Sequence, residues 1–480
     1  MRIPADPIRI GFLAFGLALI AGGAVAQPSI TLIDSIAING LSADGSVACG
    51  NSVDGLYEAC RWTALEGVVR LGRSSAAAIG RGGGVPGISD DGNAISSSII
   101  SSDTLVTQGL WTKGLGWQET MPPVLPDGGN IDEAYGSAWG LSGDGLTVVG
   151  LYWRPGGGNG NGGSAHASSW TAAGGMVDLG SQGSDSRANG VNQDGSVVVG
   201  WSSTMFGNWQ ATVWDDGVLT VLNDNEYWCE AWGTNAAGSI LVGSTLDTLS
   251  YTWPMVTTAM WKRTPGGWDE FSLGVLPGTF PRGTGQGVGL DVNQDGSIVV
   301  GYNMFSQGNV TGFVWTESQG MMKADAFLAG IGVTLPADFT VASVTCISAD
   351  GRTIGGFGVH PTDFRVPIRG FVASLDGVAA VAEPPARPAA AVTGNHPNPF
   401  NPTTTIELAI AADSTVRVEI YDARGRLVDV VHDGRLEAGN HAVTWDGRHS
   451  DGSAAPSGVY FARVRGGNAA AAAHPMVLMK

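Results

Sequence analysis

One phrase of about eleven residues recurs along the chain and constrains its fold more than any other feature. The phrase has a small or apolar lead-in, then Ser or Asn, then Asp-Gly, and then an apolar run that ends in Gly. Seven copies can be recognised, at residues 40–50, 87–96, 140–150, 190–200, 233–243, 291–301 and 346–356. Because such units bury their apolar faces against one another, the sequence predicts one repeat-built domain.

Asp-Gly between two apolar runs is typical of a β-hairpin, because the turn needs positive φ angles that Gly and Asp tolerate. We therefore interpret the aspartates of the phrase as turn residues: Asp44, Asp91, Asp144, Asp194, Asp295 and Asp350. Calcium binding is the alternative. No alternating run of Asp or Asn supplies the several oxygens that a calcium site needs, so we predict no metal.

A second signal follows each phrase, an apolar stretch that closes on Trp62, Trp111, Trp170, Trp214, Trp261 or Trp315, and on Phe371-Val372-Ala373 in the seventh unit. A further short stretch rich in Val and Leu gives each unit of about fifty residues four strands. This predicts an all-β chain with a seven-bladed β-propeller at residues 27–376. We interpret the recurring Trp as a packing residue; a ligand platform is the alternative.

The ends of the repeat region complete this prediction. The seventh unit lacks a fourth strand, whereas residues 30–33 resemble the fourth strand of the other units. We expect this N-terminal strand to close the ring, which leaves no free sheet edge. A short helical turn is predicted at residues 324–329.

Residues 1–26 have the three parts of a secretory signal peptide: Arg2 and Arg9, an apolar run over 10–21, and Ala24-Val25-Ala26. We predict cleavage near Ala26. The apolar run is shorter than the roughly 20 residues that span a bilayer. No later stretch reaches that length, so we expect no transmembrane segment in the mature chain and a secreted or cell-surface location.

The composition indicates which partners to expect and whether a disulfide can form. The net charge is −18, with 25 Lys and Arg residues against 43 Asp and Glu, so nucleic acid is not an expected partner. Cys49 and Cys60 fall on neighbouring strands of one predicted hairpin. An exported protein permits a disulfide, and we predict one between them.

The phrase followed by an apolar-Trp-Thr stretch resembles the HAF-type extracellular repeats of bacterial secreted proteins, over about residues 36–375. This resemblance implies export and a propeller-like fold. It implies no reaction.

The C-terminal part of the chain has a different character. The composition shifts to Ala and Pro at residues 377–394, which predicts an extended linker. Residues 395–480 then contain strand-like stretches at 403–408, 415–421, 441–447, 457–464 and 476–480. They predict a small β-sandwich.

Four motifs occur in this module in order: Pro-Asn-Pro-Phe-Asn-Pro, Tyr-Asp-x-x-Gly-Arg-Leu-Val, Trp-Asp-Gly and Ser-Gly-Val-Tyr. Together they resemble the immunoglobulin-like domain shared by the flagellar hook-capping FlgD family and the type A C-terminal sorting domains of the type IX secretion system. The resemblance implies an immunoglobulin-like fold that a secretion machinery recognises and then removes or links to the cell surface. A terminal cap or spacer is the alternative.

We assign no catalytic residue and no cofactor, because no nucleophile elbow or phosphate-binding loop is evident. The loop after the second strand of several units instead collects aromatic residues: Tyr152, Trp153, Trp201, Trp209, Trp253 and Tyr302. On one rim of the ring they would form a stacking platform for a glycan or a surface protein; covering blade edges is the alternative. We therefore expect a binding module. A polysaccharide hydrolase or lyase and a structural envelope component are the alternatives.

Overall fold

The computed structural model describes residues 27–479 except 56, 74–83, 102–104, 123–135, 156–162, 224–227, 249–254, 278–284, 306–309, 364–365, 377–389, 411–412, 423–425, 438, 467–468 and 471–473. The predicted signal peptide at residues 1–26 and the rim residue Trp253 lie outside the described residues. The described chain is all-β apart from α1 (Ala324–Gly330), which forms where the sequence predicts a helical turn. Within the same residues, no helix is long and apolar enough to cross a membrane.

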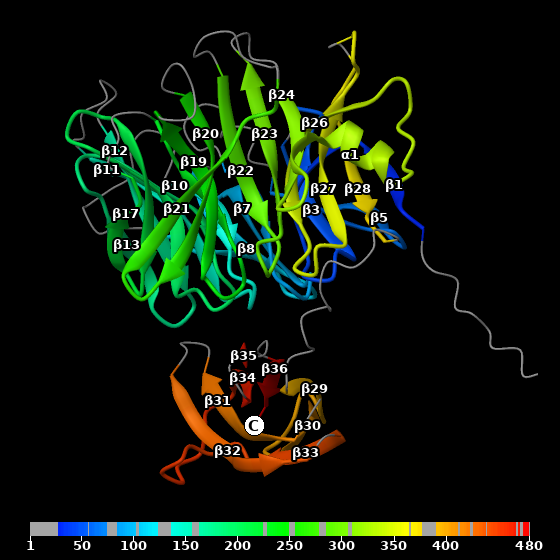
Figure 1. The fold of residues 1–480 in the computed structure, drawn as a ribbon. Helices are drawn as coiled ribbons and strands as arrows, with labels where there is room; N and C mark the ends of the chain where they lie inside the picture. Colours follow the sequence, from blue (N-terminus) through cyan, green and yellow to red (C-terminus); the bar gives the residue numbers. More distant parts are fainter. Residues whose placement is uncertain are drawn as a thin grey trace, which may run out of the picture.

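Each sheet of the repeat region is built mainly from four antiparallel strands that follow one another in the chain (Figure 1). The first two sheets contain β2 (Ile36–Leu41), β3 (Val47–Ser52), β4 (Ala59–Thr63) and β5 (Gly67–Arg70), then β6 (Gly87–Ile88), β7 (Ala94–Ile100), β8 (Val106–Thr112) and β9 (Gly116–Glu119). The next two contain β10 (Gly136–Leu141), β11 (Thr147–Pro155), β12 (Gly163–Thr171) and β13 (Gly175–Gly180), then β14 (Ser186–Val191), β15 (Val197–Ser203), β16 (Trp209–Asp215) and β17 (Val218–Val221).

The following eight strands are hydrogen-bonded into one sheet. They are β18 (Ala231–Thr234), β19 (Ile240–Asp247), β20 (Met255–Thr264), β21 (Gly267–Gly274), β22 (Gly285–Val292), β23 (Ile298–Phe305), β24 (Val310–Thr316) and β25 (Gly320–Lys323). A parallel pairing of Val256 with Gln286 joins two antiparallel runs of four strands. The sheet therefore repeats the four-strand pattern twice.

The last sheet combines both ends of the repeat region: β26 (Thr340–Ile347), β27 (Thr353–Val359), β28 (Arg369–Ser374) and β1 (Ser29–Asp34). β1 pairs antiparallel with β28, with Ile30 opposite Ala373. This confirms the prediction that residues 30–33 supply the missing fourth strand of the last unit.

The first strands of the successive four-strand units pack side by side around a common axis. β2, β6, β10, β14, β18, β22 and β26 contact one another in this order, and β26 contacts β2. The described strands form no single closed hydrogen-bonded sheet. This arrangement of separate sheets is propeller-like, as the sequence predicts.

The recurring Trp residues lie on the third strand of their sheets. Trp214 and Trp261 are fully buried, Trp62 and Trp170 are buried, and Trp111 and Trp315 are half-buried. The interpretation of these residues as packing residues is confirmed.

The aspartates of the phrase cap the hairpin turns. Asp194 Oδ1 accepts hydrogen bonds from the Ser196 hydroxyl at 2.6 Å and the Ser196 N–H at 3.1 Å. Asp44 Oδ1 accepts in the same way from the Ser42 hydroxyl at 2.7 Å. The Gly that follows has φ of 81° at Gly195, where a side chain would be strained. Each carboxylate thus stabilises its own turn.

The predicted Cys49–Cys60 disulfide is wrong, because both residues are buried free thiols. In the pairing of β3 with β4, Cys49 lies opposite Arg61 and Cys60 lies opposite Gly50. Successive residues of a strand point to opposite faces, so the two sulfurs lie on opposite sides of the sheet and cannot bond. They pack into separate apolar clusters.

The C-terminal module consists of two sheets (orange to red in Figure 1). One contains β29 (Ala390–His396), β30 (Thr404–Ile410) and β33 (Gly439–Trp445), and the other contains β31 (Ser414–Asp422), β32 (Leu427–Leu436), β34 (Gly458–Gly466), β35 (Ala469–Ala470) and β36 (His474–Leu478). β29 begins inside the segment predicted as a linker, of which residues 377–389 lie outside the described residues.

Three aromatic residues from the sequence motifs form the centre of this module. Phe400, Trp445 and Tyr460 are buried, with ring centroids 5.5 Å apart for Phe400 and Trp445 and 4.9 Å apart for Trp445 and Tyr460. Trp445 Nε1 donates to the Arg448 carbonyl at 2.9 Å, and the Tyr460 hydroxyl donates to the Pro456 carbonyl at 2.7 Å. The motifs are therefore the core of the module, with its polar atoms satisfied.

Candidate functional site

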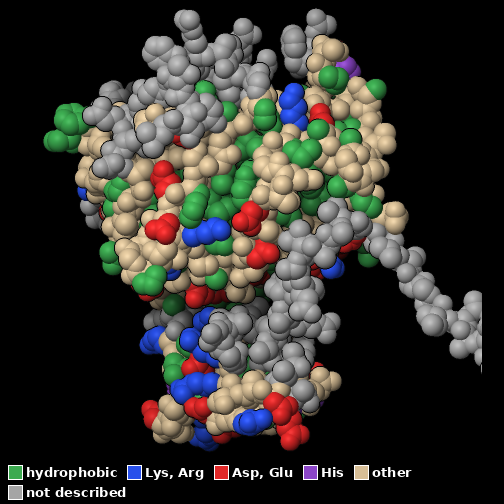
Figure 2. Space-filling view, viewed as in Figure 1, with side chains coloured by type: hydrophobic (Ala, Val, Ile, Leu, Met, Phe, Trp, Pro, Cys, Tyr) green, Lys and Arg blue, Asp and Glu red, His purple; other side chains and the backbone are tan. Residues whose placement is uncertain are grey.

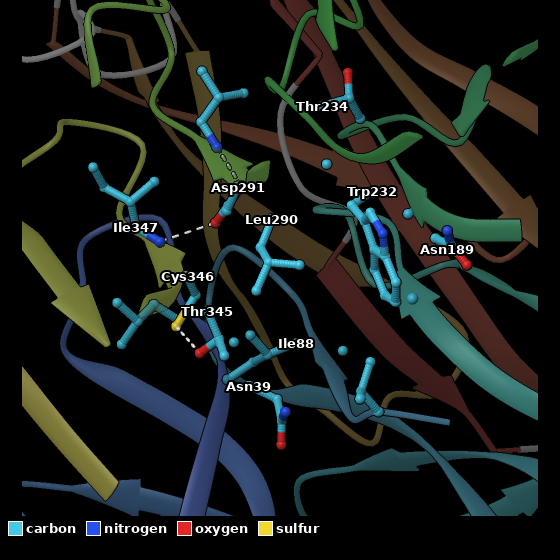
Figure 3. A pocket seen from close by; sticks show the side chains of 18 of the residues that line it. Asn39, Ile88, Asn189, Trp232, Thr234, Leu290, Asp291, Thr345, Cys346 and Ile347 are labelled. Carbon is cyan, nitrogen blue, oxygen red and sulfur yellow. Dashed lines mark hydrogen bonds between the residues drawn. The ribbon is translucent and has the colours of Figure 1, made fainter. Parts of the chain in front are cut away.

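A β-bulge in the first strand of six four-strand units turns one residue out of the described ladder. The pairing register skips Asn39, Trp139, Asn189, Trp232, Leu290 and Thr345. All six line a cavity of about 530 Å³, together with Pro86, which takes the equivalent place in the second unit (Figure 3). Because the first strands surround the common axis, the bulged side chains form a ring around a central cavity.

The Gly that ends each phrase makes room for this bulge. A Cβ on Gly200 would collide with the carbonyl oxygen of Arg187, and a Cβ on Gly301 with that of Val288. A Cβ on Gly50, Gly150, Gly243 or Gly356 would collide with a backbone carbonyl oxygen in the same way. In the second unit Ser97 takes this place, and the described part of β6 has no register shift. The Gly at the end of the phrase therefore occurs in the units whose first strand is bulged.

The residue at the bulged position differs from unit to unit. Its side chains are Asn, Pro, Trp, Asn, Trp, Leu and Thr from the first unit to the seventh, whereas the turn residues of the phrase recur. Backbone geometry requires the recurring residues. It requires nothing of a side chain that points into a cavity, so the cavity wall is the part of the repeat available for function.

Arg187 of β14 connects the aromatic part of this wall to two polar residues. Its guanidinium carbon lies 3.8 Å from the ring centroid of Trp139 and 5.3 Å from that of Trp232. Arg187 donates to Glu230 Oε2 at 2.6 Å and to Asn189 Oδ1 at 2.6 Å. Burial lowers the pKa of Arg187, and the Glu230 carboxylate opposes this shift. The cation stays charged, paired and flanked by aromatic rings.

Two of the predicted rim aromatics lie together at the outer end of this cluster. The rings of Trp201 and Trp209 stack at 4.2 Å with an interplanar angle of 10°, and Trp209 stacks on Trp228 at 4.7 Å. Trp228 is 59% exposed. Arg187 lies 5.6 Å from the Trp201 ring, so aromatic contacts run from the cavity wall to the surface.

The other described rim residues lie apart from this stack. Tyr152 is fully buried and donates to Asp178 Oδ2 at 2.8 Å, while half-buried Trp153 packs against Val106. Tyr302 lines the cavity, where burial raises the pKa of its phenol to about 12. Sequence reasoning missed Trp228, because it lies after β17, the fourth strand of its unit, and not in the loop after the second strand.

A second polar group surrounds His166 on the outer strands of the third sheet. His166 Nδ1 lies 3.0 Å from Asp178 Oδ1, and Arg154 Nη1 lies 2.7 Å from His166 Nε2. Burial acts to raise the pKa of Asp178, but hydrogen bonds from His166, the Gly180 N–H and Tyr152 together lower it to about 2. None of these residues lines the cavity. Among the described residues, no group of three His, Cys, Asp or Glu side chains is arranged to hold a metal.

Asp291 takes the place of the first Gly of the phrase in the sixth unit. Its carboxylate accepts the Val292 N–H at 2.8 Å and the Ile347 N–H at 2.9 Å (Figure 3). Burial raises the pKa of Asp291 to about 7, against the opposing effect of these two hydrogen bonds.

This carboxyl predicts a pH dependence of stability. Unfolded Asp291 loses its proton near pH 3.8 and the folded group near 7, so the folded state binds more protons between these values. The free energy of unfolding therefore falls as the pH rises through this window, on the order of 4 kcal/mol. Asp291→Gly, which introduces the residue that the first five units have at this place, should abolish this pH dependence. Urea unfolding of both proteins at pH 4 and pH 7 measures it, and equal pH slopes would contradict the assignment.

Comparison with known proteins concerns mainly the C-terminal module. Residues 399–470 match the FlgD Ig-like domain family. Over 78 residues the chain is 40% identical to the basal-body rod modification protein FlgD of Escherichia coli (strain K12), which covers 16% of this chain and 33% of that protein. The chain thus spans about a third of the length of this curated relative.

Solved structures align with the chain at low similarity. The β-propeller domain of the Trilobed protease from Pyrococcus furiosus has a TM-score of 0.42 and 11% identity, covering 72% of this chain and 96% of that domain. The putative TolB from Agrobacterium tumefaciens has a TM-score of 0.34 and 16% identity, and the alignment covers 52% of this chain and 90% of that one. The C-terminal module of this chain contains a FlgD Ig-like domain.

Proposed function

We propose that the chain is a secreted or cell-surface protein whose seven-bladed β-propeller binds a ligand in its central cavity. The ring of bulged, non-repeating side chains around the cavity is the observation on which this rests. A volume of about 530 Å³ lies within the range of small-molecule sites. In this proposal the HAF-like repeats supply the scaffold, and the FlgD-like module addresses the protein to a secretion machinery of the type IX kind or to the surface.

Three features support the count of seven blades. Seven first strands contact one another in cyclic order, and the eight-stranded sheet divides into two four-strand runs at its parallel pairing. The last four-stranded sheet takes its fourth strand from the N-terminal end of the repeats.

The lining favours binding over polysaccharide hydrolysis or lysis. No His is among the described lining residues, and its carboxyl groups are those of Asp90 and Asp291. Asp291 already accepts two backbone N–H groups. Figure 2 shows acidic side chains dispersed over the visible face of the repeat region, with few Lys or Arg side chains among them. Such a surface favours solubility outside the cell over attachment to polyanions.

A cavity-filling substitution tests the binding site. Leu290→Trp enlarges a side chain that points into the cavity, and the equivalent places in the third and fifth units already hold Trp139 and Trp232. We expect the variant to fold normally and to lose the ligands that the wild-type protein binds on a glycan array or retains from culture medium and envelope extract. Leu65→Trp, at a side chain that is 95% exposed, is the matched control. Equal binding by Leu290→Trp and wild type would place the site elsewhere.

A truncation tests the export role of the C-terminal module. Because β29 begins at Ala390, the deletion should remove residues 390–480. We expect the truncated protein to accumulate in the periplasm while the full chain reaches the surface or the medium, as shown by cell fractionation and immunoblotting. Circular dichroism of the truncated protein checks that its sheets are intact. Normal release of a folded truncated protein would contradict the proposal and favour a spacer.

A further inference from the structure

Two indole rings form an aromatic corner on the cavity wall. Trp139 and Trp232 are both half-buried, with centroids 6.1 Å apart and ring planes at 57°. Arg187 holds them from one side of the cluster, and its hydrogen bonds to Glu230 and Asn189 fix it in place. The electron-rich indole faces attract the polarised C–H groups of a flat, non-aromatic ring.

Neutral polar groups lie elsewhere on the wall, among apolar side chains such as Ile88 and Leu290. Asn39 lies on the bulge of β2, and its carboxamide Oδ1 has no hydrogen-bond partner among the described residues. Rotation of the amide presents either its oxygen or its NH₂ group to a ligand. Figure 3 shows Asn39 and Thr345 on the part of the wall away from Trp232. A buried amide without a partner is costly, so a ligand hydroxyl that pairs with Asn39 gains that energy.

The charged groups at the cavity already have hydrogen-bond partners within the protein. Arg187 is paired with Glu230 at 2.6 Å. Asp291 accepts two backbone N–H groups, and Asp90 accepts a hydrogen bond from Gln193. No Lys, Arg or His side chain is among the described lining residues, so an anionic ligand would meet no cation on the wall, whereas a neutral polyhydroxylated ring meets both an aromatic face and amide groups.

From these contacts we infer that the central cavity binds one neutral sugar ring, stacked in the Trp139–Trp232 corner and hydrogen-bonded to Asn39. This inference rests on the proposed binding function and specifies its ligand class. It differs from a rim platform, because the sugar lies at the axis and not on Trp228.

Titration of the purified full chain with simple sugars tests the ligand class. Glucose, galactose, mannose and N-acetylglucosamine are the neutral probes, and galacturonate is the charged probe. Trp139 and Trp232 make intrinsic fluorescence a direct readout. We expect saturable quenching with at least one neutral sugar and binding of galacturonate weaker by about tenfold or more, because its carboxylate has no partner.

Substitutions borrowed from other units test the position of the ring. Trp232→Leu and Asn39→Leu copy the residue that the sixth unit has at the same place, Leu290, so folding should be kept. Each substitution should lower the affinity for the neutral sugar by about tenfold. Trp228→Leu, in the exposed stack, is the matched control and should change affinity less than twofold.

The outcomes separate this inference from the proposed function. Unchanged sugar affinity in Trp232→Leu and Asn39→Leu would overturn the sugar site. If no neutral sugar binds, yet Leu290→Trp loses another ligand that the wild type retains, the sugar inference falls and the binding function stands. Absence of any ligand in every assay overturns both.

Discussion

Gly200→Ala is expected to lower the free energy of unfolding by roughly 3 kcal/mol, at the upper end of the usual cost of overpacking. The new methyl group would collide with the carbonyl oxygen of Arg187, which is backbone and cannot rotate away. Relief requires the bulge at Asn189 to straighten, which also moves Arg187 and its partner Glu230. The substitution should therefore disturb stability and the cavity wall together.

Urea unfolding of Gly200→Ala and wild type measures this effect. Gly207→Ala is the matched control, because Gly207 has φ of 86° but open space where a Cβ would stand. Its expected cost is about 1 kcal/mol, from the left-handed backbone alone. A cost for Gly200→Ala no greater than that of Gly207→Ala would contradict the steric role of the repeated Gly.

The link between Gly200 and the bulge also marks the limit of sequence reasoning. The strands and turns follow from Asp-Gly and the apolar runs, because both are local signals. A bulge depends on which residues of two strands face each other, and the phrase does not reveal that register. The ring of bulged residues could therefore be seen only in the paired strands.

Register also explains the error over Cys49 and Cys60. The hairpin itself was predictable, but a bridge needs both side chains on one face. Cys60 lies opposite Gly50, one residue beyond Cys49, and this single step places the thiols on opposite faces. In the aromatic cluster, Trp201 and Trp209 could be named from the sequence. Trp139 and Trp232 join them only through contacts with Arg187 of the unit between them, and Trp228 through its stacking on Trp209.

The C-terminal module was more accessible to prediction because its motifs are its core. Phe400, Trp445 and Tyr460 come from three of the four motifs and pack together. Its first strand, β29, was not predicted. β29 begins with Ala390-Ala391, and Ala has low β-propensity, so this start resembles the Ala-rich segment before it.

Deletion of residues 29–34 should have the larger effect of the two predictions. This removes β1, which covers the edge of β28 and carries Ile33, buried, and Ile30 and Leu32, partly buried against the core of the last sheet. Loss of the apolar burial that these three aliphatic side chains provide costs roughly 5 kcal/mol. We expect a fall in the thermal midpoint of about 10 °C. The exposed edge of β28 should also promote aggregation, which light scattering detects.

A peptide added in trans distinguishes loss of ring closure from general damage. A synthetic peptide with the sequence of residues 29–34 can pair with the open edge of β28 as an added strand. It should restore part of the thermal midpoint of the deletion variant, whereas a scrambled peptide should not. Because β2 and Asn39 follow β1 directly, ligand binding should return together with the midpoint. An unchanged midpoint after deletion would mean that packing between the first strands, and not the shared last sheet, holds the ring closed.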